Sequence, residues 1–211
     1  MEDWEKLREF GNVPVDVALL KKVFSDYASP SNKIEELCRR GLILRARRGL
    51  YVVAPRVSHK EVSRFLLANH MYGPSYISLE TALEYHGLIP EAVYEIRSVT
   101  PYRGKEYDTM FGRFLYRSVP IGYFKVGITM EGTDEQRCLM ASPEKALCDL
   151  LMLTNDLRIQ SARAIREYLE GFLRIDMERI ADFDTDTITE CINAGRKKTT
   201  LVRLLEAIKN G

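Results

Sequence analysis

The sequence has few cysteines and histidines, and neither residue type is spaced as in a metal site. Cys38, Cys138, Cys148 and Cys191 lie far apart along the chain, with no C-x-x-C pair among them. This spacing argues against a zinc site or a disulfide framework, so we expect buried free thiols. The three histidines have no neighbouring ligand at metal-binding spacing. We expect them near helix ends, where a histidine interacts favourably with the helix dipole.

Long apolar runs and phosphate-binding glycine loops are also absent. The N-terminus, MEDWEKLREF, is charged, and no apolar stretch is long enough for a signal peptide or a membrane-spanning helix. We therefore expect a cytoplasmic protein with no membrane partner. Because no glycine pattern of the Walker or dinucleotide-binding type is present, we expect no cofactor.

Neither sign of charge is in excess over the whole chain, but the charges are unevenly distributed. The 211 residues have a formal net charge of +1. Residues 33–56 alone hold seven basic and two acidic residues. A hairpin can carry arginines for solubility, but four arginines within nine residues exceed what solvation requires. This local positive field favours a nucleic-acid partner for the segment.

Residues 29–55, SPSNKIEELCRRGLILRARRGLYVVAP, form the most informative segment. Ser29 suits the N-cap of a helix, Pro30 its first turn, and Gly41 the left-handed conformation that ends it. After Gly41 the apolar residues form two strand-like runs around a cluster of arginines, with Gly49 at the turn. The segment therefore predicts a short helix followed by a basic hairpin.

Two further helices are expected before this segment. Trp4, Leu7 and Phe10 have the spacing of a helix that ends near Gly11, and Asp16 leads into a second helix. The resulting order is three helices followed by a two-stranded wing. This order is the plan of a winged helix-turn-helix, in which the third helix reads DNA.

Beyond residue 57 the pattern predicts a second domain. Ser58 and Glu61 suit the capping box of a helix that Gly73-Pro74 ends, and Ser78 can cap the next one. The other expected elements are strands at 94–100, 113–119 and 123–129, a helix opened by Ser142-Pro143-Glu144, and helices at 162–172, 175–180, 188–192 and 201–208. We expect an α+β fold with a winged helix-turn-helix domain at 1–56 and a mixed α/β domain at 57–211, divided into a sheet-containing part (57–155) and a helical tail (156–211).

Three segments together resemble a known family. They read RRGLILRARRGLYVVAP, YISLETALEYHGLIPEAVYEI and LMASPEKALCDLLML, and span roughly residues 35–155. The combination of R-R-G-x-Y, S-x-x-x-A-L-x-x-H-G-L and P-E-K-A-L-x-D-L is similar to the AbiEi family of type IV antitoxins and transcriptional regulators. The resemblance implies a C-terminal antitoxin domain, repression of the protein's own operon, and a nucleotidyltransferase-like toxin as functional partner, without implying direct contact between toxin and antitoxin.

On this interpretation, eight residues contact double-stranded DNA of the protein's own promoter, where inverted repeats are expected. The residues at the start of the helix (31–33) are placed to reach the major groove, and those at its far end (39 and 40) to reach the DNA backbone. The wing arginines (45, 47 and 48) are placed to contact phosphates or the adjacent minor groove. If about five phosphates are neutralised, log K falls with a slope near −4.5 against log salt. The eight residues are, in that order, Ser31, Asn32 and Lys33; Arg39 and Arg40; and Arg45, Arg47 and Arg48.

An enzymatic function is the less favoured alternative. Ser142 and Lys145 fit the S-x-x-K motif of some serine hydrolases, but the accompanying S-D-N and K-T-G are absent, and a helix cap explains them better. Acidic residues between Glu91 and Asp108 suggest a metal-dependent nuclease, but no pattern brings them to one site. We therefore expect no catalytic residues and no metal.

A non-enzymatic protein-binding adaptor that uses the C-terminal half is the stronger alternative. Tyr102, Arg103, Lys105 and Tyr107 share one predicted loop. Aromatic and basic side chains together suit a surface for protein or RNA. A partner that co-purifies in stoichiometric amount would favour the adaptor.

Overall fold

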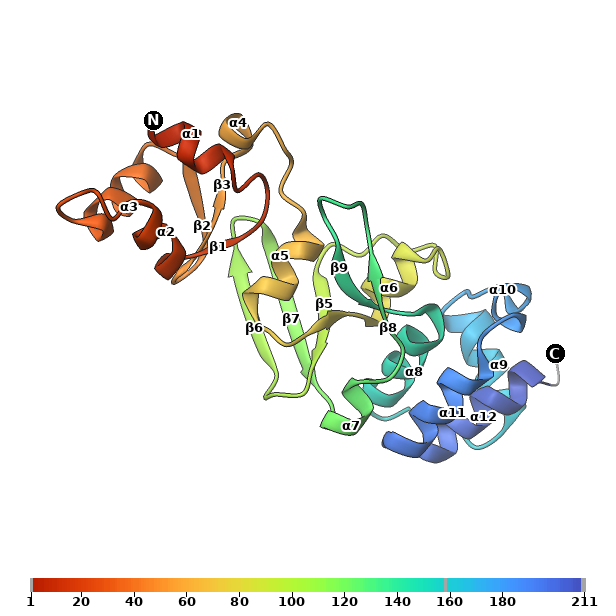
Figure 1. Ribbon diagram of the computed structural model, residues 1–211. Coiled ribbons are helices and arrows are strands. Elements are labelled where there is room, and N and C mark those ends of the chain that lie inside the picture. Colours follow the sequence, from red (N-terminus) through yellow and green to blue (C-terminus); the bar gives the residue numbers. More distant parts are fainter. Residues whose placement is uncertain (1, 158, 210–211) are drawn as a thin grey trace.

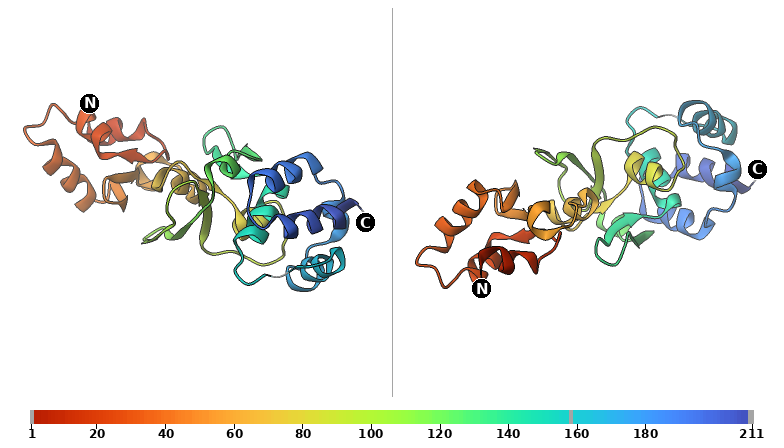
Figure 2. Two further views of the ribbon diagram at one scale, coloured as in Figure 1. Left: turned by 90° about the horizontal axis from the view of Figure 1, so that it is seen from below. Right: turned by 90° about the horizontal axis from the view of Figure 1, so that it is seen from above.

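The computed structural model describes residues 2–157 and 159–209 and has a mixed α/β architecture (Figure 1). Within these ranges the chain forms twelve α-helices, one π-helical segment and two β-sheets. The molecule is elongated, with the N-terminal elements at one end and the C-terminal helices at the other (Figure 2). None of the described helices combines the length and the apolar character needed to cross a membrane.

The N-terminal elements enclose a small hydrophobic core of their own. Their three strands form an antiparallel sheet in the order β1-β3-β2, and Leu7, Leu20 and Leu37 are fully buried. This core extends to Val57, one residue beyond the domain limit that the sequence predicts. The elements are α1 (Asp3–Arg8), β1 (Val15–Asp16), α2 (Val17–Val23), α3 (Pro30–Arg39), β2 (Ile43–Arg47), β3 (Leu50–Val53) and α4 (Pro55–Ser58).

The capping residues of α2 and α3 act as their sequence predicts. Asp16 Oδ1 accepts a hydrogen bond from the Leu19 amide at 2.8 Å, and Ser29 Oγ accepts one from the Asn32 amide at 3.4 Å. Each bond satisfies an amide that has no partner within its helix. Gly41, at φ +65°, follows the end of α3 in the left-handed conformation that glycine adopts without strain.

The second part of the chain is built on a six-stranded mixed sheet in the order β6-β7-β5-β4-β9-β8. β5 pairs with β7 and β4 with β9 in parallel, and the other neighbours are antiparallel. The strands are β4 (Tyr76–Ile77), β5 (Ile96–Thr100), β6 (Lys105–Thr109), β7 (Gly112–Ser118), β8 (Ile128–Glu131) and β9 (Cys138–Ala141). The helices are α5 (Arg64–Met71), α6 (Leu79–Tyr85), α7 (Ile121–Phe124), α8 (Pro143–Leu153), α9 (Ala162–Glu167), the π-helical η1 (Tyr168–Phe172), α10 (Met177–Ala181), α11 (Thr185–Ala194) and α12 (Lys198–Lys209).

Helix α8 joins the sheet to the C-terminal helices. It contacts β9 and α6 on one side and α11 and α12 on the other. Every residue of α8 from Lys145 to Met152 is buried, so the helix lies inside the second part of the chain. The predicted tail helices are all present, although the first is divided into α9 and η1.

A fully buried ion pair lies at the centre of this arrangement. Lys145 Nζ and Asp149 Oδ1, one helical turn apart in α8, are 2.8 Å apart and have no exposed side-chain surface. Asp149 Oδ2 also accepts hydrogen bonds from Ser78 Oγ at 2.6 Å and Tyr76 Oη at 3.0 Å. Burial, together with the nearby Asp149 carboxylate, raises the pKa of Tyr76, so its hydroxyl stays protonated and donates.

The same lysine is surrounded by aromatic and carbonyl groups. Its Nζ lies 3.2 Å from the centroid of the Tyr123 ring and donates to the Tyr123 carbonyl oxygen at 3.3 Å. A buried charge costs free energy unless it is paired and hydrogen-bonded, and this network supplies both. Lys145 and Asp149 therefore link α8 to β4, to the start of α6 and to α7.

Several expected elements differ from the structure. Ser58 does not cap a helix, because it ends α4 and its hydroxyl donates to the Lys60 carbonyl oxygen at 3.2 Å; Ser63 caps the next helix, α5. Segment 123–129 is not a strand throughout, because α7 occupies 121–124 and β8 begins at Ile128. In this helical turn the Tyr123 ring is buried and lies against the Lys145 amine. Strands β4, β6 and β9 were not expected.

We predict that Asp149→Asn lowers the free energy of unfolding by about 3–5 kcal/mol, because it leaves the Lys145 charge buried without a counterion. The control is Glu167→Gln, which breaks an exposed ion pair with Arg163 of the same i, i+4 spacing and should cost at most about 0.5 kcal/mol. Urea denaturation measures both. Similar losses in the two variants would contradict a central role for the buried pair.

Candidate nucleic-acid interface

Helix α3 has one buried face and one exposed face. Ile34 and Leu37 point into the N-terminal core, whereas Ser31, Asn32 and Arg39 are exposed. Ser31 and Asn32 lie in the first turn of the helix. Three predicted contact residues are thus accessible to a ligand.

Lys33 is placed differently from the prediction. Its residue exposure is 9%, and its Nζ lies 2.7 Å from Asp3 Oδ2 and 3.2 Å from Glu36 Oε2. It also lies 4.6 Å from the centroid of the Tyr27 ring, whose hydroxyl donates to Asp3 Oδ1 at 2.6 Å. The expectation that Lys33 projects toward DNA is therefore wrong for this conformation, because the amine joins α1 to α3.

The opposing charges of this cluster shift one another's pKa values. The hydrogen bond to Asp3 raises the pKa of Lys33. Partial burial raises the pKa of Asp3, but the hydrogen bonds to Lys33 and Tyr27 outweigh it and hold that pKa below its usual 3.8. Both charged forms are therefore stabilised near neutral pH.

Arg40, at the end of α3, is exposed and paired. Its Nη1 lies 3.1 Å from Glu36 Oε1, one turn earlier in the helix. Exposed pairs of this kind contribute little to stability, so a phosphate can replace the carboxylate at small cost. The Arg40 and Gly41 carbonyl oxygens accept hydrogen bonds from Arg56, which sequence patterns did not reveal as a partner of the helix end.

The β2–β3 hairpin carries two exposed arginines beside α3. Arg45 and Arg48 are exposed, and α3 packs against β2. The Arg45 guanidinium lies 5.6 Å from the centroid of the Tyr51 ring, directly across the hairpin. This contact holds the exposed arginine over the Tyr51 ring. Gly49, at φ +82°, supplies the turn at the tip.

Arg47 is half-buried and connects the hairpin to the second part of the chain. Its Nε donates to the Met71 carbonyl oxygen at 2.7 Å, and its Nη1 donates to the Arg48 carbonyl oxygen at 3.0 Å. Met71 is the last residue of α5. The structure thus gives Arg47 a positioning role, whereas the sequence suggests a contact with phosphates or the adjacent minor groove.

A second group of basic side chains lies next to this connection. Tyr72 follows Met71, and its hydroxyl donates to the Arg103 carbonyl oxygen at 3.1 Å. Lys105 Nζ lies 4.9 Å from the centroid of the Tyr72 ring. Arg103, Lys105 and Arg117 are exposed and line a shallow hollow with Tyr72. The structure thus places Arg103 and Lys105, which the sequence suggests for a binding surface, beside the connection between the hairpin and the second sheet, in a hollow that Glu106 also lines.

The residues considered for enzymatic functions have structural roles. Ser142 Oγ accepts a hydrogen bond from the Lys145 amide at 3.3 Å, so it caps α8, and the Lys145 amine is bonded to Asp149 instead of to Ser142. His86 ends α6 and its Nε2 lies 2.9 Å from the Ala141 carbonyl oxygen. Among residues 2–157 and 159–209, no group of histidine, cysteine and acidic side chains is placed to hold a metal ion.

Comparison of the whole sequence with known proteins gives no assignment. No model of a protein family matches the chain, and no curated protein matches it. The resemblance to the AbiEi family therefore stays a prediction that rests on the three segments quoted above. The exposed residues of α3 and the hairpin are the physical basis for a function.

We predict that Asp3→Asn destabilises the protein at pH 7 because it removes the nearer of the two charged partners of Lys33. The pKa of Asp3 is lower in the folded state than in the unfolded state, where it is near 3.8. Ionised Asp3 therefore adds to the free energy of unfolding above pH 3.8, and this stabilisation is lost as the pH falls through the folded pKa. The urea midpoints of Asp3→Asn and the wild type should therefore converge as the pH falls below 3.8 toward the folded pKa of Asp3. Asp182→Asn, at an exposed position, is the control. A difference that persists at the lower pH would contradict this role.

Proposed function

We propose that the N-terminal elements form a winged helix-turn-helix that binds double-stranded DNA through α3 and the β2–β3 hairpin. The observation that carries the proposal is the placement of Ser31, Asn32 and Arg39 on the exposed face of α3, with Arg45 and Arg48 on the adjacent hairpin. A buried apolar face positions the helix, and the polar face and the arginines are left for a ligand. Polyanion binding explains this local excess of positive charge in a chain that is nearly neutral overall.

In this mode the first turn of α3 enters the major groove. Asn32 has the donor and acceptor that pair with an adenine edge, and Ser31 can bond a base or a phosphate. Arg39 and Arg40 contact the backbone near the end of the helix, and Arg45 and Arg48 contact phosphates or a narrow minor groove. Arg47 orients the hairpin through Met71, and Lys33 holds α3 against α1.

We further propose that the protein represses its own operon and acts as the antitoxin of a type IV toxin–antitoxin system. The resemblance to the AbiEi family supports this part. Two of the three segments that carry it, YISLETALEYHGL and SPEKALCDLLML, contribute Tyr76, Ser78, Lys145 and Asp149 to one buried network. The motif residues are thus joined in space, which suits segments that specify one domain. The functional partner would be a nucleotidyltransferase-like toxin.

Arg45→Ala together with Arg48→Ala should weaken binding to every DNA sequence by at least about tenfold. The loss of two phosphate contacts should also change the slope of log K against log salt from about −4.5 to about −2.7. Fluorescence anisotropy with two unrelated duplexes across a salt series measures both effects.

The matched control removes the same charge from the opposite end of the molecule. Arg163→Ala together with Arg174→Ala alters two exposed arginines among the C-terminal helices. This variant should keep the wild-type affinity and salt slope. Equal losses in both double variants would show that binding depends on overall charge and would contradict the proposed interface.

The antitoxin function predicts that expression of this protein restores growth to cells that produce the nucleotidyltransferase encoded beside it. Growth curves with the toxin alone, with both proteins, and with an empty vector measure the effect. Because type IV antitoxins need not touch their toxins, rescue without a stable complex is consistent with the proposal. Absence of rescue by a folded, expressed protein would refute the antitoxin function and leave DNA binding as a separate question.

A further inference from the structure

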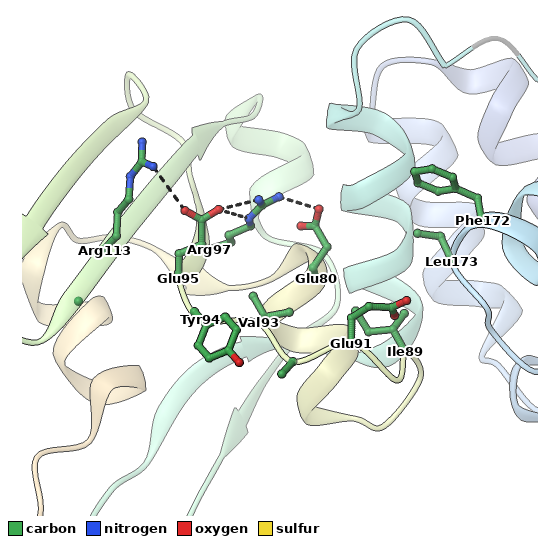
Figure 3. Close-up of a pocket in the computed structure, with 12 residues that line it drawn as sticks. Glu80, Ile89, Glu91, Val93, Tyr94, Glu95, Arg97, Arg113, Phe172 and Leu173 are labelled. Atoms are coloured by element: carbon green, nitrogen blue, oxygen red, sulfur yellow. Dashed lines mark hydrogen bonds and ion pairs between the residues drawn. The ribbon is translucent and has the colours of Figure 1, made fainter.

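A pocket of about 790 Å³ lies in the second part of the chain and is lined by none of the candidate DNA-contacting residues (Figure 3). It is bounded by the loop between α6 and β5, by β5 and the start of β7, and by the end of η1. Its walls are mostly apolar and include Ile89, Ala92, Val93, Phe172 and Leu173. Pockets of this size and character commonly bind small organic molecules.

The polar lining of the pocket includes two carboxylates that share one guanidinium, whose Nε, Nη1 and Nη2 each donate one hydrogen bond to them. Arg97 Nη1 lies 2.6 Å from Glu80 Oε1, and Arg97 Nη2 and Nε lie 2.6 and 3.0 Å from Glu95 Oε1 (Figure 3). One guanidinium is thus shared by two carboxylates. Arg113, 3.8 Å from Glu95, is more closely paired with Glu106 at 2.8 Å. The local charge is therefore negative.

Glu80 keeps an unused acceptor at this end of the pocket. Its Oε2 is buried and has no hydrogen-bond partner among the described residues. A buried acceptor without a partner is unfavourable, and a donor from a ligand would remove that cost once the Glu80 side chain, which is 27% exposed, turns this oxygen toward the pocket. Since the guanidinium of Arg97 is already bonded to carboxylates, the pocket offers acceptors in preference to donors.

The loop that forms one wall is held in place by side chains from three elements. The Val93 amide donates to Glu84 Oε2 at 3.0 Å, and the Glu95 carbonyl oxygen accepts from Thr81 Oγ1 at 3.1 Å, both from α6. The Tyr94 carbonyl oxygen accepts a hydrogen bond from Arg64 of α5. Arg174, after η1, forms an ion pair with Glu91. The wall is therefore formed before a ligand arrives, which lowers the entropic cost of binding.

We propose that this pocket binds a small organic cation with an apolar body and one ammonium or guanidinium group. The apolar body packs among Ile89, Val93, Phe172 and Leu173, and the cationic group bonds to Glu80 Oε2 and the Glu95 carboxylate. An anion of the same shape would meet carboxylates whose arginine partners are already engaged, so it is disfavoured. The proposal does not depend on DNA binding.

The probes are 4-phenylbutylamine and 4-phenylbutyrate, which share an apolar body and differ in the sign of their charge. Titration of the full-length protein, followed by two-dimensional ¹⁵N–¹H NMR, should show amine-dependent shifts at residues 89–95 and 172–173. A dissociation constant of about millimolar is expected for a probe of this size. The carboxylate should bind at least about fivefold more weakly.

Two variants test the apolar walls and the carboxylate end of the pocket separately. Ala92→Trp fills the pocket and should abolish the shifts, whereas Glu80→Gln keeps a bond to Arg97 but removes a charge and should weaken amine binding about fivefold. Glu190→Gln, at an exposed position on α11, should leave binding unchanged. Unaltered ¹⁵N–¹H cross-peaks for residues that do not line the pocket show that each variant is folded.

Three results would overturn the proposal. Amine-induced shifts confined to residues that do not line the pocket, or no shifts at all, would exclude the site. Equal binding of the amine and the carboxylate would exclude recognition of a cation. Unchanged amine affinity in folded Glu80→Gln would exclude the assigned role of that carboxylate.

Discussion

The buried pair of Lys145 and Asp149 is the interaction on which the second part of the chain depends. Because both groups have lost their water, each must be satisfied by the protein, and the partners come from β4, the start of α6 and α7. The strand, the helices and the sheet can therefore meet only in an arrangement that brings Tyr76, Ser78 and Tyr123 to α8. Helix α8 then carries α11 and α12 on its other side. One ion pair thus connects the sheet with the C-terminal helices.

A second set of contacts relates the candidate DNA interface to this sheet. Arg47 on the hairpin bonds to Met71, and the next residue, Tyr72, lies beneath Lys105 of β6. Arg47 of the hairpin and Lys105 of the sheet edge thus contact two consecutive residues of the chain, Met71 and Tyr72. Under the proposed function, this arrangement lets a single duplex meet both parts of the protein, and it explains why Arg47 is only half-exposed.

Local features of the structure could be predicted from the sequence, whereas long-range pairings could not. Ser29, Gly41 and Asp16 act on amides or dihedral angles within a few residues, so their effects on α2 and α3 follow from the sequence. The environment of Lys33 depends on Asp3, thirty positions earlier, and no spacing rule connects them. β6 is charged and mostly exposed, and β4 has two residues, so neither gives a clear strand pattern.

The candidate site shows the same division. The exposed face of α3 and the arginines of the hairpin follow from helical spacing and from composition. Arg47 bonds to Met71, and Lys105 lies close to the Tyr72 ring. Both contacts depend on how segments far apart in the sequence pack together. The pocket lined by Glu80, Arg97 and Phe172 likewise combines elements separated by many residues, so it appears only in the folded structure.

The central claim is that this protein reads a DNA sequence through α3 and the hairpin. The most direct measurement is the affinity of the full-length protein for DNA upstream of its own gene, compared with a shuffled duplex, by fluorescence anisotropy across a salt series. We expect a preference of at least about tenfold, equivalent to about 1.4 kcal/mol, with an affinity that falls steeply as salt rises. No binding at low salt would contradict it and would favour a protein partner for the C-terminal half.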